Sequence, residues 1–248
     1  MQPRHTYAVG DIHGHLDLLR GVHDLIDKDM ARYGAGKVVH VGDLVDRGPD
    51  SRGVVGYLRQ GLAQGQDWIV LKSNHDRLFT MFMDDPKASD PGLRPEYSWL
   101  HPKIGGSETL ESYGVPNAAD RPVAKVHADA LERVPQEDLD FLASRPAWHR
   151  VDGVIFVHAG VRPGLPIAEQ AENDLLWIRK GFLDHADPFE ALIVHGHTAI
   201  NAPTHYGNRV NIDSSAAYGG PLSAIVIEGA DVFHLTIKGR VPLRPESQ

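Results

Sequence analysis

Two kinds of hydrophobic pattern alternate over the first 80 residues of the chain. Short apolar runs predict β-strands, and longer stretches with apolar residues at three- and four-residue steps predict helices with one buried face. The predicted order is strand 7–9, helix 16–26, strand 37–41, helix 51–62 and strand 68–71. The strand ends recur at about the 30-residue length of a βαβ unit, so the pattern predicts a parallel sheet covered by helices.

The pattern is lost between about residues 83 and 122, where Pro, Gly and charged residues are frequent and neither period persists. Loops of this length in a compact domain are usually functional or disordered. We therefore expect a single domain over 1–248, with an insertion at about 83–122 that contains short helices and lines the substrate site. A helical pattern follows at about 134–144.

The C-terminal part of the chain is rich in predicted strands. Apolar runs at 154–157 and 191–194 each end in a histidine-containing turn. Three further runs, at 209–213, 222–227 and 231–237, follow at short spacing, as in an antiparallel meander. The whole chain is thus predicted to be an α/β protein.

Potential metal ligands follow five of the predicted strands. They are Asp11, His13, Asp43, Asn74, His158 and His197. The carboxyl ends of parallel strands share one edge of a sheet, where ligands bind. Oxygen and nitrogen donors without thiolates suit two divalent ions such as Mn²⁺, Fe²⁺ or Zn²⁺ better than a structural zinc site.

The individual signals differ in specificity. Taken alone, Asp11 and His13 are weak evidence for a metal site, because an aspartate that caps a helix and a surface histidine are the more frequent explanation. The run Gly-Asp-Leu-Val-Asp-Arg-Gly at 42–48 is more specific, because two carboxylates and an arginine directly after a strand have little structural purpose.

Composition narrows the classes of partner. The 25 Lys and Arg residues against 33 Asp and Glu residues give a net charge of −8, and the basic residues are scattered. This balance disfavours nucleic acid and anionic membranes as partners. The absence of cysteine excludes disulfides, Cys-ligated zinc and thiol catalysis. Because no membrane span and no signal peptide are apparent, we expect a cytoplasmic protein that is a monomer or a weak oligomer.

Five motifs together resemble the signature blocks of calcineurin-like metallophosphoesterases, specifically the bacterial and phage form of the phosphoprotein phosphatase branch. They are Gly-Asp-Ile-His-Gly (10–14), Gly-Asp-Leu-Val-Asp-Arg-Gly (42–48), Ser-Asn-His-Asp (73–76), His-Ala-Gly (158–160) and Gly-His-Thr (196–198). Weaker matches at 175–179 and 211–220 extend the resemblance, which runs from residue 7 to about 229. It implies a four-layer α-β-β-α sandwich of two mixed sheets flanked by helices.

The resemblance also implies a dinuclear metal site, with Mn²⁺ as the expected ion and Fe²⁺ or Zn²⁺ as alternatives. In this scheme Asp11 and His13 bind the first ion and Asp43 bridges the two ions. The implied ligands of the second ion are Asn74, His158 and His197.

Four further residues acquire catalytic roles from the same resemblance. Arg47 and Arg179 match the positions that hold phosphate oxygens, and His75 matches a general acid that Asp46 orients. By contrast, His195 and Asp76 are expected to be structural or to support the ligands from behind.

These groups predict a metal-dependent serine/threonine protein phosphatase. A hydroxide that bridges the two ions would attack phosphorus directly. The arginine forks would bind phosphoryl oxygens, and an imidazolium would protonate the leaving alkoxide. The expected substrate is a phosphorylated protein or peptide, or a small phosphoester.

Two alternatives remain open. A symmetrical dinucleoside polyphosphate (Ap4A) hydrolase shares these motifs, and the segment 99–113 resembles bacterial members of both kinds. A polyphosphate binder should add cations beyond the two arginines. Lys103 is the only cation near that segment, which favours the protein phosphatase.

The other alternative is a metal-binding module with impaired catalysis. Ser73 stands where the family usually has Gly, and Ser214-Ser215 stands where the subgroup usually has Thr-Gly. This alternative requires that the Cβ of Ser73 tilts Asn74 and weakens the binding of the second ion.

Overall fold

The computed structural model describes residues 5–245, which form two mixed β-sheets flanked by helices. The first sheet has six strands in the order β11-β10-β9-β1-β2-β3. Their bounds are β1 (His5–Val9), β2 (Gly36–His40), β3 (Trp68–Val70), β9 (Ala224–Glu228), β10 (Asp231–Thr236) and β11 (Gly239–Pro242). β1, β2 and β3 are parallel, and α1 (Leu16–Tyr33) and α2 (Ser51–Ala63) connect them. The βαβ units predicted from the sequence are confirmed.

The second sheet has five strands in the order β4-β5-β6-β8-β7. Their bounds are β4 (Trp148–Val151), β5 (Val154–Val157), β6 (Leu192–His195), β7 (Thr204–His205) and β8 (Arg209–Asn211). β5, β6 and β8 are parallel, whereas β4 and β7 pair antiparallel at the two edges.

The predicted meander is wrong at its first strand. Only β9, β10 and β11 form an antiparallel meander. β8 lies in the other sheet, parallel to β6, with Ile193 opposite Arg209. The apolar run at 209–213 specified a buried strand but carried no information about which strand would pair with it.

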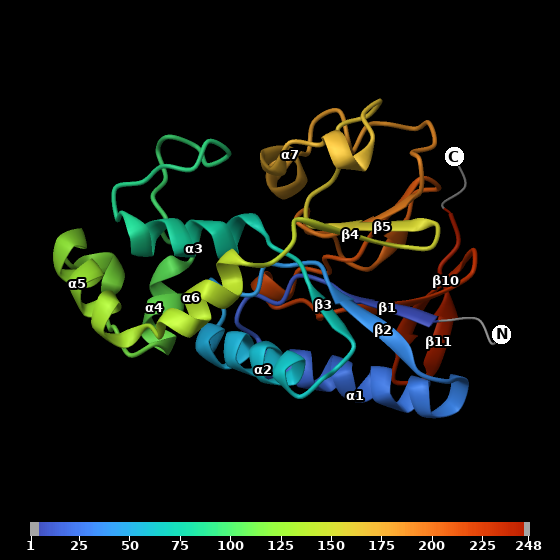
Figure 1. Cartoon of the computed structure of the whole chain (residues 1–248), viewed down its shortest axis with the longest axis horizontal. Helices are drawn as coiled ribbons and strands as arrows, with labels where there is room; N and C mark the ends of the chain where they lie inside the picture. Colours follow the sequence, from blue (N-terminus) through green and yellow to red (C-terminus); the bar gives the residue numbers. More distant parts are fainter. Residues whose placement is uncertain (1–4, 246–248) are drawn as a thin grey trace.

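Side-chain alternation along the strands produces three hydrophobic layers. Ala8 of β1 and Val39 of β2 face the second sheet, where they pack with Phe156 and Val194. Tyr7 and its neighbours on the opposite face pack against α1 and α2. A third cluster covers the outer face of the second sheet. Figure 1 shows this order, with α1 and α2 below the sheets and α7 (Glu172–Trp177) above them.

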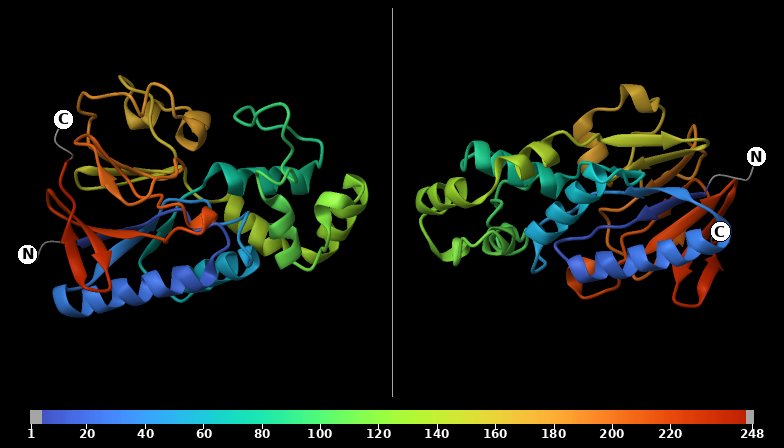
Figure 2. Two further views of the ribbon diagram at one scale, coloured as in Figure 1. Left: turned by 180° about the vertical axis from the view of Figure 1, so that it is seen from behind. Right: turned by 60° about the horizontal axis from the view of Figure 1, so that its bottom comes forward.

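The remaining helices form a lobe beside the sheets, which Figure 2 shows from two further directions. The helices of this lobe are α3 (Asn74–Asp84), α4 (Gly106–Ser112), α5 (Val123–Arg133) and α6 (Gln136–Ala143). α6 lies within the predicted helix 134–144, whereas α5 was not predicted. Short 3₁₀ turns occur at η1 (Ala118–Asp120), η2 (Ile167–Glu169) and η3 (Ala216–Tyr218). Within residues 5–245, no helix has the length and apolar character needed to cross a membrane.

The contact between the two sheets gives a first prediction. Phe156 is fully buried between them, so Phe156→Ala is expected to lower the free energy of unfolding by about 3–5 kcal/mol. Urea denaturation, monitored by circular dichroism, measures this loss of stability. Leu131→Ala is the control, because Leu131 on α5 is 57% exposed. Equal losses in the two variants would contradict the assignment of this core.

Candidate metal centre

Strand ends from both sheets meet at a cavity of about 300 Å³. Eight of the residues singled out in the sequence line it, namely Asp11, His13, Asp43, Arg47, Asn74, His75, Arg179 and His197. The other two lie directly behind this wall, where His158 contacts Asn74 and Asp46 contacts His75. The structure thus brings all ten residues together.

The loops that carry these residues have unusual backbone geometry. His13, Asp43 and His197 have φ values of 46°, 49° and 65°, and Asp46 and Arg47 have φ values of 74° and 68°. They make up five of the eight non-glycine residues with positive φ within residues 5–245. Left-handed conformations at non-glycine residues store strain and concentrate at functional sites.

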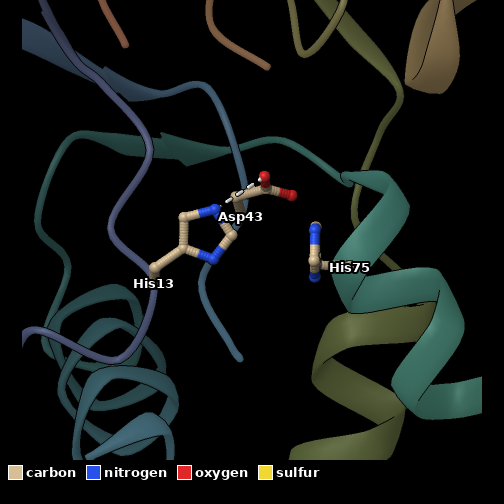
Figure 3. Close-up of side chains that lie close together, drawn as sticks. All are labelled: His13, Asp43 and His75. Atoms are coloured by element: carbon tan, nitrogen blue, oxygen red, sulfur yellow. Dashed lines mark ion pairs between the residues drawn. The ribbon is translucent and has the colours of Figure 1, made fainter. Parts of the chain in front are cut away.

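Backbone carbonyls fix the orientation of two imidazoles. Nδ1 of His13 lies 2.9 Å from the carbonyl oxygen of Val45, and Nδ1 of His158 lies 2.9 Å from that of Val41. A carbonyl only accepts hydrogen bonds, so each Nδ1 donates and the neutral ring presents a lone pair at Nε2. Both lone pairs face Asp43, at 3.0 Å from Oδ2 for His13 and 3.3 Å from Oδ1 for His158. Figure 3 shows His13 and Asp43 facing each other, with His75 beside them.

These acceptors cannot satisfy one another. Among the described residues, Oδ1 of Asp11, Oδ1 of Asp43 and Nε2 of His197 are buried without a hydrogen-bond partner. Burial, followed by the charges of Asp213 and Asp43, raises the pKa of Asp11 well above its usual value. Burial also lowers the pKa of His158 to about 4, so this ring is neutral at pH 7. A buried set of carboxylates and neutral imidazoles fits divalent cations.

The potential metal ligands form two groups that share one carboxylate. His13, Asp43 and His75 offer atoms within 4.8 Å of one another, and so do Asp43, His158 and His197. The shared position of Asp43 suits a bridging ligand. Asp11 lies beside this set, where its Oδ2 accepts a hydrogen bond of 2.8 Å from the backbone N–H of His197.

His75 belongs geometrically to the first group but is held differently. Its Nδ1 lies 2.7 Å from Oδ2 of Asp46, and its Nε2 lies 3.0 Å from Nη2 of Arg47. Since arginine only donates, Nε2 is the acceptor here and Nδ1 carries the proton toward Asp46. The second fork nitrogen of Arg47, Nη1, donates to Nε2 of His13 at 2.8 Å. Arg179 also lines the cavity, and its Nη2 donates to the carbonyl oxygen of His197 at 2.9 Å.

Ser73 does not turn Asn74 away from the cavity. Its hydroxyl caps α3, accepting from the backbone N–H of Asp76 at 3.2 Å and donating to Oδ2 of Asp76 at 2.7 Å. Asn74 keeps its Oδ1 within 2.7 Å of Nε2 of His158. Asp76 also accepts from the backbone N–H of Leu44, so it links α3 to the loop that carries Asp43.

His195 does not line the cavity. Its ring is fully buried, Nδ1 lies against the carbonyl of Gly196, and Nε2 lies 3.3 Å from Nη1 of Arg209.

The sequence reasoning missed several residues that line the cavity, namely Asp213, Arg94, Tyr97, Trp177 and Tyr218. Asp213 follows the apolar run of β8, so it carries the same strand-end signal as the predicted ligands. Near the segment 99–113, the sequence pointed only to Lys103 as a cation beyond the two arginines, whereas Arg94, which precedes this segment, also lines the cavity. The ammonium of Lys103 instead donates to the hydroxyl of Tyr97 at 3.1 Å.

Comparison with known proteins agrees with this geometry. The family model described as calcineurin-like phosphoesterase matches residues 5–227. Serine/threonine-protein phosphatase 1 of Salmonella typhimurium is 28% identical over 91% of this chain and 93% of its own length. The asymmetrical bis(5'-nucleosyl)-tetraphosphatase PrpE of Bacillus thuringiensis is 23% identical, with 96% of each chain covered. The solved structure of a cold-active protein tyrosine phosphatase has the same fold, with a TM-score of 0.64, 18% identity, and coverage of 98% of this chain and 79% of its own. This chain belongs to the calcineurin-like phosphoesterase family.

Proposed function

We propose that the protein is a metal-dependent phosphatase that hydrolyses phosphoserine and phosphothreonine monoesters by direct transfer of the phosphoryl group to water. One observation carries this proposal. Buried side chains that could bind metal ions, two arginines and His75, which Asp46 holds from behind, meet at the same cavity. The similarity to serine/threonine-protein phosphatase 1 over nearly the full chain supports the choice of substrate.

The proposed ion-binding residues are those of the sequence analysis. Asp11 and His13 would hold one ion, Asn74, His158 and His197 the other, and Asp43 both. Two divalent ions bound there would neutralise phosphoryl oxygens and lower the pKa of a water molecule between them. Mn²⁺ is the proposed metal, and a cytoplasmic location stays a prediction.

The arginines would position the phosphoryl group. In the structure, the two terminal nitrogens of Arg47 donate to imidazole nitrogens of His13 and His75. A substrate phosphate would be the better acceptor, because hydrogen bonds between charged groups are stronger than those to a neutral ring. Arg179, which lines the same cavity, would supply a second guanidinium to the phosphate.

His75 would protonate the leaving oxygen. Asp46 holds Nδ1, so Nε2 points into the cavity and is released when Arg47 turns to the phosphate. Burial lowers the pKa of His75, and a phosphate dianion beside the ring would act in the opposite direction. Nε2 would take up a proton from solvent once Arg47 binds the phosphate, which gives the imidazolium form of the ring. That proton would then pass to the ester oxygen as its bond to phosphorus breaks.

A second candidate function is the hydrolysis of dinucleoside polyphosphates. Arg94 favours it, because this exposed arginine supplies a third guanidinium at the cavity, and no ion pair holds it within residues 5–245. Tyr97, Trp177 and Tyr218 add aromatic faces on which a base could stack. The similarity to the tetraphosphatase PrpE is consistent with this candidate.

Replacement of His75 tests the proposed acid. His75→Asn is expected to lower kcat on a phosphoserine peptide by about 10²–10⁴-fold, because the leaving alkoxide loses its proton donor. Bound Mn²⁺, measured by plasma mass spectrometry after gel filtration, should stay at the wild-type level. A variant that loses metal along with activity would show that His75 is a ligand instead.

The bridging role of Asp43 is tested by metal binding rather than by the rate of hydrolysis. Asp43→Asn removes the carboxylate that both donor groups share, so Mn²⁺ binding at both positions should weaken. Isothermal titration calorimetry with Mn²⁺ measures the binding affinity directly, without substrate. Asp152→Asn, at an exposed turn between β4 and β5, is the control. Wild-type Mn²⁺ affinity in Asp43→Asn would contradict the bridging assignment.

Substrate choice is tested by comparing wild type with Arg94→Gln on a phosphoserine peptide and on diadenosine tetraphosphate. The proposed phosphatase should prefer the peptide. If the second candidate is correct, the wild-type protein prefers diadenosine tetraphosphate. Arg94→Gln then raises the KM for this dinucleotide about 10-fold, because one charged hydrogen bond is lost. Lys87→Gln is the matched control, because Lys87 lies in the same insertion but does not line the cavity.

A further inference from the structure

The carboxylate of Asp46 is surrounded by donors, two of which come from the insertion. Asp46 is fully buried, and its Oδ2 lies 2.7 Å from Nδ1 of His75. Nε1 of Trp99 donates to Oδ1 and Oδ2 at 3.1 and 3.0 Å. The hydroxyl of Thr109 donates to Oδ1 at 2.8 Å. These two donors lie 53 and 63 residues beyond Asp46 in the chain.

We propose that Trp99 and Thr109 are positioning residues that hold Asp46, and through it the imidazole of His75, in the orientation needed to protonate the leaving oxygen. The inference rests on the proposed function, in which His75 is the proton donor. It gives the insertion a part in the chemical step in addition to its place at the cavity wall.

Thr109 fixes the backbone of Asp46 as well as its side chain. The backbone N–H of Asp46 donates to Oγ1 of Thr109 at 2.8 Å, and Oγ of Ser51 lies 3.0 Å from the same Oγ1. The threonine hydroxyl thus accepts from the main chain of Asp46 and donates to its carboxylate. Asp46 has a φ of 74°, a strained conformation that needs such support.

Trp99 connects the same carboxylate to the helix that carries His75. Its ring is 5% exposed and stacks on Phe79 of α3, with centroids 5.1 Å apart and planes 16° apart. His75 is the second residue of α3. The indole therefore fixes the distance between Asp46 and α3 by packing on one side and by its N–H on the other.

The electrostatics agree with this arrangement. Burial raises the pKa of Asp46 to about 7, and the hydrogen bonds from Thr109 and Trp99 act to lower it. Without these donors, the carboxylate would keep His75 as a partner but lose the contacts that favour its ionised form and fix its plane. An Asp46 free to rotate would no longer direct Nε2 of His75 toward one point.

Leaving-group dependence separates this role from a purely structural one. Phosphoserine releases a strongly basic alkoxide that needs a proton, whereas p-nitrophenyl phosphate releases a weakly basic phenolate that does not. Thr109→Val keeps the shape of the side chain and removes the hydroxyl. We expect it to lower kcat on a phosphoserine peptide by about 10-fold or more and to change kcat on p-nitrophenyl phosphate by less than about threefold.

Three further variants complete the experiment. Trp99→Phe should show the same selective loss, and Thr109→Ser, which retains a hydroxyl, should restore the wild-type ratio of the two rates. Tyr113→Phe is the matched control, because its buried hydroxyl in the same insertion donates to Asp138, away from the site. Far-ultraviolet circular dichroism and Mn²⁺ titration check that each variant is folded and binds metal.

The outcomes distinguish the inference from the function on which it rests. An equal loss on both substrates in Thr109→Val, or no loss on either, overturns the inference. His75→Asn is measured in parallel on the same two substrates. If it shows the selective loss while Thr109→Val and Trp99→Phe do not, the inference alone fails. If His75→Asn shows no selective loss, the proposed acid fails together with the inference.

Discussion

The burial of mutually repelling lone pairs at one edge of two sheets is the constraint on which the rest of this structure depends. Asp11, Asp43 and Asp213 bring three carboxylates to one cavity, and His13 and His158 point their acceptor nitrogens at Asp43. Buried charges of like sign are stable only when cations or donors compensate them. A site that suits cations is therefore a property of the folded chain rather than of any single residue.

The two sheets together bring potential metal ligands to one cavity, which no single sheet could do. The loops after neighbouring strands β1 and β2 carry Asp11 and Asp43, whereas the loops after β5 and β6 carry His158 and His197. Hydrogen bonds cross between the sheets, from His158 to the carbonyl of Val41 and from the backbone of His197 to Asp11. A shift of one residue in the register of β1 would move Tyr7 to the face now occupied by Ala8 and would break the layer between the sheets. The core and the candidate metal centre thus depend on the same strand register.

Much of this arrangement was predictable because strand ends are visible in the sequence. A polar motif directly after an apolar run identified Asp11, Asp43, Asn74, His158 and His197 and predicted that they meet. The pairing of β8 with β6 was not predictable, because the choice of a partner strand depends on packing over long separations. Arg94 was missed for a related reason, since no local period links a residue in the insertion to a cavity formed by other loops. The effect of Ser73 was also invisible, because its compensation by Asp76 and Leu44 depends on hydrogen bonds across the fold.

The insertion divides into an inner and an outer part with different exposure. Trp99 and Thr109 are 5% and 0% exposed and contact the buried carboxylate behind His75. Arg94 and Tyr97 lie at the cavity on the solvent side, and in the described part of the chain they form no hydrogen bond with the atoms proposed to bind metal. Under the proposed function, a change in the outer part would alter what is recognised beyond the phosphate, whereas a change in the inner part would slow the reaction of substrates whose leaving group needs a proton. Since the two parts are only a few residues apart, this division depends on the backbone between them, where Trp99 is anchored on α3. Under the proposed function, one segment would therefore set substrate choice without disturbing the hydrolytic machinery that it helps to support.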